Sequence, residues 1–196
     1  MPVFSSAYFP SLAYVRAMLH NPTIELDLHE HFIKQSIRTR AEVLTANGVV
    51  QLNLPIVHVS GHKQAMATIQ IDYTKNWQAE HWRTIESAYG AAPHFEHYAH
   101  DILGIFAKKH RYLHELNTDI LLWLNQALEL KLNICYAASF TGQTDSNKKA
   151  WLDRDVQTSR VYKQVFGEKN VFVPNLSILD GLMNEGPMIR AYFLPR

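Results

Sequence analysis

The most constraining feature of this 196-residue chain is a long helical middle flanked on both sides by strand-like segments. Apolar residues recur at helical spacing over residues 77–89, 94–109 and 112–130, and no proline interrupts the third segment. Before the middle, Thr23–Leu28 alternates apolar and polar residues, and after it Leu132–Ala138 is a mostly apolar run. Strand and helix patterns in this order predict an α/β fold, with a mixed α+β arrangement as the alternative.

The amino-terminal third predicts both parallel and antiparallel strand pairing. An extended run over residues 2–8, a short helix and the strand at residues 23–28 indicate a parallel start. An Asn-Gly dipeptide at residues 47–48, which favours a tight hairpin, joins two runs with period-two alternation, Ile33–Thr45 and Val49–Val59. We therefore expect a mixed parallel and antiparallel sheet with the helical middle packed on it.

Length and composition favour a single globular domain over residues 1–196, since a typical domain has about 150 residues. Apolar residues make up 47% of the chain and charged residues 19%, which excludes a disordered chain. The net charge of +1 provides no field that would attract nucleic acid or an anionic membrane. The sequence shows no leader segment and no membrane-spanning run, and its one cysteine, Cys135, cannot form an internal disulfide. We expect a cytoplasmic protein that neither binds nucleic acid nor inserts into a membrane.

Three cations and a hydroxyl fall on one face of the first run of the predicted hairpin. They are Lys34, Ser36, Arg38 and Arg40, spaced by about 7 Å for each step of two residues. Because the planar guanidinium of arginine matches the geometry of phosphate oxygens, such a row can hold a phosphate. The alternative is the solvated polar face of a half-exposed sheet, and Glu42 on the same face agrees with it.

The helix predicted over residues 77–89 places a histidine beside large aromatic side chains. His81 shares a stripe with Trp77, and Trp82 and Tyr89 lie beside that stripe. A histidine next to rings on which a substrate can stack is a candidate general base. The commoner alternative is a core histidine that is hydrogen-bonded to the backbone.

The remaining histidines and the glycines do not form a recognisable metal or nucleotide motif. On one helix, His94 and His100 point about 120° apart with His97 between them. His110 and His114 have the spacing of metal ligands, but the H-E-x-x-H pattern is absent. The sequence also has no G-x-S-x-G, G-x-G-x-x-G or Walker loop. We therefore expect no metal site, and the sequence identifies no cofactor.

Several segments share their order and spacing with one known family. The clearest are Tyr-Phe-Pro at 8–10, Phe-x-Lys-x-Ser at 32–36, Asn-Trp at 76–77 with His-Trp-x-Thr-Ile-Glu-x-Ala-Tyr at 81–89, and Pro-Asn-Leu-Ser-Ile-Leu-Asp at 174–180. Together they resemble the WbqC-like family of small bacterial proteins, which are often linked to surface-polysaccharide synthesis. The resemblance covers most of the chain.

The resemblance implies a transferase-like protein of bacterial surface-polysaccharide (O-antigen-type) biosynthesis, with aminoacyl or glycine transfer to a sugar or nucleotide-sugar as the suggested reaction. In this interpretation the basic row holds phosphate, the tryptophans provide a stacking surface and His81 acts as the base. The substrate-binding candidates are Tyr8, Lys34, Ser36, Arg38, Arg40, Trp77, Trp82 and Tyr89, and the catalytic candidate is His81.

The chain also departs from the family pattern at several positions. Ser6 and Ala7 stand before the tyrosine where the family has His-Gln-Pro, Ile37 replaces a tryptophan, and Thr39 and Ala41 replace two asparagines. These departures leave open a second hypothesis, a non-catalytic scaffold or assembly partner in the same pathway with a degenerated site. The expected partners are a phosphorylated or nucleotide-linked sugar and, for the second hypothesis, another copy of this chain.

Overall fold

The computed structural model describes residues 2–57, 64–142, 161–167 and 171–193. Helices and strands follow one another along these residues, which confirms the predicted mixed α/β class. In chain order the elements are β1 (Val3–Phe4), α1 (Leu12–Leu19), β2 (Thr23–Leu26), β3 (Arg40–Thr45), β4 (Gly48–Asn53), the 3₁₀ helix η1 (Met66–Thr68), α2 (Trp77–Tyr89), α3 (Phe95–Ala107), α4 (Leu113–Ala127), β5 (Asn133–Tyr136), α5 (Ile178–Glu185) and the 3₁₀ helix η2 (Gly186–Tyr192).

Parallel and antiparallel pairing occur in two separate sheets. β2 lies between β1 and β5, and all three strands are parallel. β3 and β4 form an antiparallel hairpin in which Thr45 pairs with Gly48. The turn is where the Asn-Gly dipeptide predicts it, because Gly48 adopts a φ of 103° that residues with a Cβ avoid. Both predicted kinds of pairing are therefore present.

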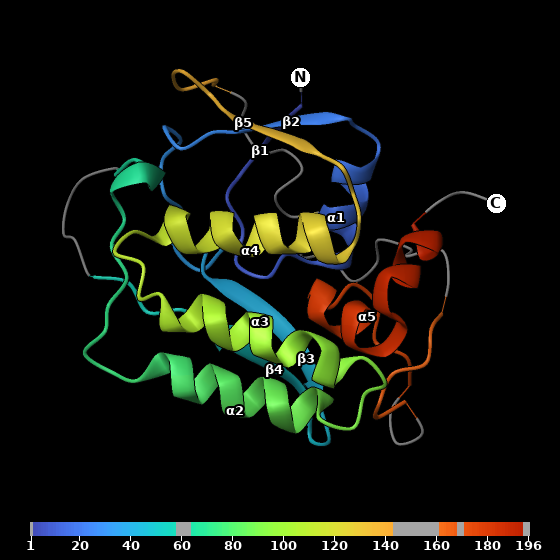
Figure 1. Ribbon diagram of the computed structural model, residues 1–196. Coiled ribbons are helices and arrows are strands. Elements are labelled where there is room, and N and C mark those ends of the chain that lie inside the picture. The colour runs from blue at the N-terminus through green and yellow to red at the C-terminus, as the bar shows by residue number, and fades with distance from the viewer. Residues whose placement is uncertain (1, 58–63, 143–160, 168–170, 194–196) are drawn as a thin grey trace.

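The three central helices lie side by side, with α4 nearest the parallel sheet and the β3–β4 hairpin behind α2 and α3 (Figure 1). Each helix has a completely buried apolar stripe, represented by Ile85 in α2, Ile102 in α3 and Ile120 in α4. α2 begins where the Asn76 side chain accepts a hydrogen bond from the backbone of Ala79. No helix of the described ranges is long and apolar enough to cross a membrane.

The Tyr-Phe-Pro turn near the amino terminus is held against the segment that precedes α5. The backbone N–H of Ile178 donates to the carbonyl of Pro10 at 2.7 Å, and the hydroxyl of Ser177 donates to the carbonyl of Phe9 at 3.0 Å. Two segments that carried the family resemblance, although distant in sequence, therefore meet in the fold. Ser177 also caps α5, since its side chain accepts from the backbone of Leu179.

The prediction of a strand over Ile33–Thr45 is wrong in its first half. The strand begins only at Arg40, and residues 33–39 form turns. Gln35 has a φ of 56°, which a strand cannot accommodate, and the Ser36 hydroxyl donates to the carbonyl of Ile33 at 2.7 Å. This local turn replaces the extended backbone that the alternating pattern predicted.

The second predicted strand, over Val49–Val59, is shorter than its pattern. β4 ends at Asn53, two residues before Pro55, whose missing N–H cannot take part in a ladder. Residues 58 and 59 lie outside the described residues. The hairpin is therefore limited to the six residue pairs from Arg40–Asn53 to Thr45–Gly48.

Replacing Gly48 with alanine should lower the free energy of unfolding by about 1 kcal/mol, because the φ of 103° becomes strained. Gly104 is the matched control, since it lies inside α3 with open space for a Cβ. Gly104→Ala should instead raise the free energy of unfolding by about 0.5–1 kcal/mol. Urea unfolding followed by circular dichroism measures both changes, and effects of the same sign would contradict the turn geometry.

Candidate functional site

The carboxyl ends of the three parallel strands meet at one edge of their sheet. Phe4 pairs with Leu26, and Leu26 pairs with Tyr136, so the residues that follow, among them Ser5 and Asp27, leave the sheet at the same edge. In α/β folds, ligands bind outside the carboxyl ends of parallel strands. The strand topology therefore predicts a ligand site at this edge.

A buried ion pair between Arg38 and Glu30 lies at this edge. The guanidinium of Arg38 contacts both carboxylate oxygens of Glu30, with Nε 2.9 Å from Oε1 and Nη2 2.6 Å from Oε2. Arg38 also donates to the hydroxyls of Ser5 at 3.0 Å and Ser36 at 3.2 Å, and its side chain has no exposed surface. We call Ser5, Glu30, Ser36 and Arg38 the edge cluster.

Asp27 orders the backbone next to the edge cluster. Its Oδ1 accepts from the backbone N–H groups of His29 at 2.9 Å and Glu30 at 3.0 Å. Its Oδ2 accepts from the backbone and the hydroxyl of Thr141, at 3.0 and 2.8 Å. Burial alone would raise the pKa of Asp27, but these hydrogen bonds outweigh it and hold the pKa below its usual value. The ionised carboxylate thus ties the segment after β2 to the segment after β5.

The four residues of the predicted basic row do not share a strand face, because the backbone turns at Gln35 before β3 begins. Arg38 is buried in the edge cluster, whereas the side chain of Lys34 is exposed. Ser36 and Arg40 are half-buried. Their alignment as a row is therefore corrected, and their role in binding a phosphate stays a prediction.

Tyr8 and His81 are partners inside the core. The Tyr8 hydroxyl lies 2.8 Å from Nδ1 of His81, and the ring of His81 also hydrogen-bonds the backbone of Asn53. Only 5% of His81 and none of Tyr8 is exposed. Burial lowers the pKa of His81 to about 4, so the ring is neutral at pH 7. This is the arrangement of a core histidine, and the role of His81 as a base stays a prediction.

The aromatic candidates of α2 differ in how accessible they are. Trp77 and Tyr89 are buried, and Tyr89 lies beside the buried carboxylate of Asp180. Trp82 is half-buried, stacks on Phe95 with ring centroids 5.8 Å apart, and lines a pocket. Trp82 therefore has surface that a substrate can contact, whereas Trp77 and Tyr89 are packed in the core. The role of all three in binding a substrate stays a prediction.

The pocket at Trp82 has a volume of about 700 Å³ and lies between the start of α2 and the end of α3. Tyr73 and Phe106 provide further aromatic surface, and Lys75 and Lys109 provide positive charge. Sequence reasoning named none of these four residues as a site residue. The apolar pattern marks Tyr73 and Phe106 only as packing positions, and no pattern marks the two lysines. None of the predicted basic row lines this pocket.

Comparison with known proteins agrees with the motifs. A model of the WbqC-like protein family matches residues 5–157 of the chain. The chain is also 26% identical over 215 residues to a protein of Mycobacterium tuberculosis described as uncharacterized protein Rv1507c, in an alignment that covers 91% of this chain and 88% of that protein. No solved structure matches the chain.

Replacing Arg38 with methionine should lower the free energy of unfolding by about 3–5 kcal/mol, because the carboxylate of Glu30 loses its buried cationic partner. Arg40→Met is the matched control, since Arg40 is half-buried at the start of β3, and it should cost about 1 kcal/mol or less. Chemical denaturation compares the two variants. Equal losses would show that the ion pair does not hold this edge together.

His81 should make the protein less stable as the pH falls through the range from 6.5 to about 4. As the pH falls, His81 of the unfolded chain binds a proton before His81 of the folded protein does. The contribution of neutral His81 to the free energy of unfolding is therefore complete above pH 6.5, and it is lost as the pH falls to the folded pKa. The difference between the unfolded and the folded pKa of His81 corresponds to about 3 kcal/mol of unfolding free energy. Urea unfolding at pH 7 and pH 4.5 should show a smaller acid loss for His81→Gln than for the wild type, and equal losses would contradict the burial of a neutral ring.

Proposed function

Since the chain belongs to the WbqC-like protein family, we propose that it is a transferase-like protein of bacterial surface-polysaccharide biosynthesis that binds a phosphorylated or nucleotide-linked sugar beside its edge cluster. The suggested reaction joins an aminoacyl group, such as glycine, to that sugar. A hydroxyl or amine of the sugar attacks the carbonyl carbon of an activated aminoacyl donor and forms the new acyl bond. The leaving group of the donor departs with the bonding electrons, and the proton of the sugar passes to water.

The observation that carries the proposal is the buried charge network at the carboxyl edge of the parallel sheet. Burying the charges of Arg38 and Glu30 costs several kcal/mol per ion, and apolar side chains of similar volume often stabilise a protein as well or better. The pair is therefore better explained by a task at this edge than by stability alone. That task is to fix the turn that contains Ser36 and presents the exposed side chain of Lys34.

In this arrangement the phosphate contacts the ammonium of Lys34 and the guanidinium of Arg40, the two cations of the predicted row that are not buried. The Ser36 hydroxyl holds the turn instead, because it donates its proton to the carbonyl of Ile33 at 2.7 Å. Arg38 is a positioning residue, because it is buried and acts through Ser36, from whose hydroxyl its Nη1 is 3.2 Å away. Lysine binds phosphate as a compact point charge that competes with water, so the proposal implies a modest affinity suited to a metabolite. No proton transfer is assigned to His81, since its ring is buried and bonded to Tyr8.

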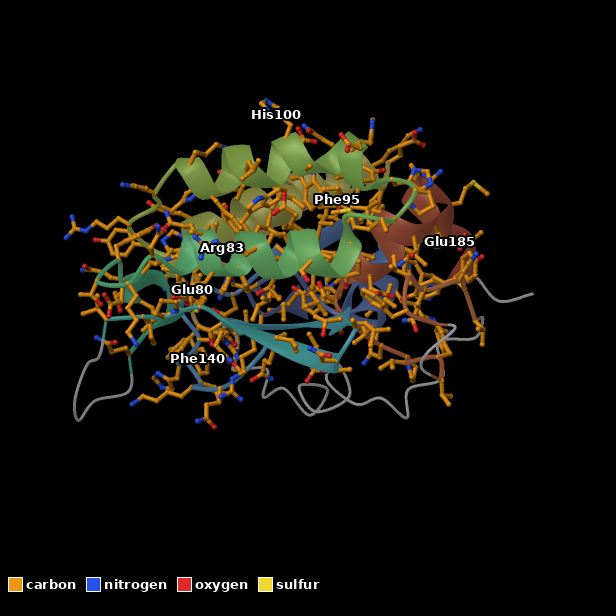
Figure 2. The ribbon with its side chains drawn as sticks, turned by 90° about the horizontal axis from the view of Figure 1, so that it is seen from below. Glu80, Arg83, Phe95, His100, Phe140 and Glu185 are labelled. Carbon is orange, nitrogen blue, oxygen red and sulfur yellow. The ribbon has the colours of Figure 1, made fainter. Side chains whose placement is uncertain are left out.

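Aromatic surface is available for the sugar ring beside the same edge. The rings of His31 and Phe140 lie 5.7 Å apart, and Phe140 is 52% exposed. Figure 2 labels Phe140 at the lower side of the ribbon, away from α3. Phe140 directly precedes Thr141, which is bonded to Asp27, so the ring is anchored next to the carboxyl edge. Exposed rings of this kind provide an apolar face against which a sugar can pack.

The burial of five predicted site residues favours a second candidate function, a non-catalytic scaffold or assembly partner in the same pathway. The side chains of Tyr8, Arg38, Trp77, His81 and Tyr89 all lie in the core. This is the result expected of a chain in which an ancestral site has been converted to packing. In that case the partner is another protein, which includes a second copy of this chain.

A thermal-shift panel of sugar phosphates, nucleotide-sugars and amino acids, with and without Mg²⁺, tests the proposal. A ligand at 100 times its dissociation constant adds about 2.7 kcal/mol of stability, which is easily measured. The shift should disappear in the double variant Lys34→Ala with Arg40→Ala, because neither side chain is buried and both belong to the predicted phosphate contacts.

The control is the double variant Arg83→Ala with Lys163→Ala, which removes the same charge from exposed positions elsewhere. It should leave the shift unchanged. Stabilisation that survives in the Lys34→Ala, Arg40→Ala variant would exclude the edge cluster as the site. If no compound stabilises the wild type, the scaffold hypothesis is favoured, and light scattering should then show an oligomer.

A further inference from the structure

The pocket between α2 and α3 has the walls of a site for a flat ring. Trp82 is half-buried and Tyr73 is 36% exposed, so both present accessible aromatic surface, and the buried Phe106 also lines the pocket. The volume of about 700 Å³ falls within the range of pockets that hold small organic ligands, roughly 300–1,000 Å³. Figure 1 shows the start of α2 and the end of α3 at the same end of the helical layer.

The charge of the pocket is positive. Lys75 and Lys109 line it, and among the described residues no aspartate or glutamate does. Two acids interact with lining residues from outside the lining. Asp72 accepts a hydrogen bond from the backbone of Thr74 and interacts with Lys75, and Glu115 interacts with Tyr73. The neighbouring Lys108 adds no positive charge to the pocket, because its ammonium is paired with the carboxylate of Asp119 at 2.6 Å. An anionic group therefore complements the lining.

The helix ends around the pocket reinforce this polarity. α2 is 13 residues long and its first turn, which begins after Asn76, contributes partial positive charge to the rim. The first turn also carries Glu80, which is exposed and is not among the lining residues. At the end of α3 the carbonyl of Phe106, which has the opposite partial charge, already accepts a hydrogen bond from the Gln78 side chain at 3.3 Å. The Phe106 carbonyl is thus already hydrogen-bonded, and the start of α2 with its partial positive charge remains available to a ligand.

From these walls and charges we propose that this pocket binds a ring-bearing phosphate compound of about the size of a mononucleotide. The ring stacks on Trp82 and Tyr73, and the phosphate lies between the ammonium groups of Lys75 and Lys109. This site shares no lining residue with the edge cluster. The inference therefore goes beyond the proposed function, and either can fail without the other.

Tryptophan fluorescence during titration with uridine monophosphate tests the inference, with uridine and inorganic phosphate as the comparison ligands. Among the tryptophans of the described residues Trp82 is the accessible reporter, since Trp77 and Trp123 are only 2% and 8% exposed. The fourth, Trp151, lies outside the described residues, and the Trp82→Phe variant therefore identifies the source of the signal. Uridine monophosphate should quench the fluorescence and raise the melting temperature. The Trp82→Phe variant should lose the quenching and keep the thermal shift, because phenylalanine retains a ring for stacking.

The lysines are tested with the double variant Lys75→Ala, Lys109→Ala, in which both residues are exposed and the fold should be preserved. It should weaken binding of uridine monophosphate about tenfold, the sum of two modest charge contacts, and leave uridine unaffected. The control Arg83→Ala, Lys163→Ala removes the same charge from other exposed positions and should bind as the wild type does.

Three results would overturn the inference. The first is that millimolar uridine monophosphate causes neither quenching nor a thermal shift. The second is an affinity that does not change in the Lys75→Ala, Lys109→Ala variant, which would place the phosphate elsewhere. The third is that inorganic phosphate binds as tightly as uridine monophosphate, since the ring would then contribute nothing.

Discussion

The buried pairing of Arg38 with Glu30 determines how the segments around the parallel sheet can be arranged. An unpaired charge at this depth would cost several kcal/mol, so the turn over residues 33–39 has to bring Arg38 inward before β3 can begin. The same guanidinium bonds Ser5, which follows β1. Asn117 of α4 extends the network, because its amide donates to the carbonyl of Arg38 at 3.0 Å. One interaction thus ties two strands, a turn and a helix together.

The elements that the sequence predicted well are those that local rules specify. The Asn-Gly turn needs only a glycine with positive φ, and α2 needs only its apolar stripe and the Asn76 cap, so α2 was predicted to the residue. Residues 33–39 show the limit of such rules. Their alternating pattern suits a strand, but the partner that decides their conformation, Glu30, was not part of the pattern. A buried arginine cannot be distinguished from an exposed one by spacing alone.

The residues of the candidate site also show what sequence patterns cannot predict. His81 and Trp82 are neighbours in sequence, yet one ring is fixed in the core by Tyr8 and the other lines a pocket. Lys75 and Lys109 are brought together only because α2 and α3 pack with the start of one beside the end of the other (Figure 1). Tertiary contacts of this kind leave no periodic signal. The family motifs nevertheless pointed to segments that do meet, as Phe9 and Ser177 show.

Two surfaces of the molecule thus have different tasks: the edge cluster serves a sugar phosphate, and the pocket of α2 and α3 holds a ring-bearing phosphate. The most direct test is a titration of the ¹⁵N-labelled protein with a hexose phosphate, followed through its backbone amide signals. We predict that the shifts are confined to the residues around the edge cluster, at positions 5–6, 27–36 and 141. Shifts that are absent, or that lie in residues 73–79 and 103–109 instead, would contradict the central claim that the carboxyl edge of the parallel sheet is the sugar-phosphate site.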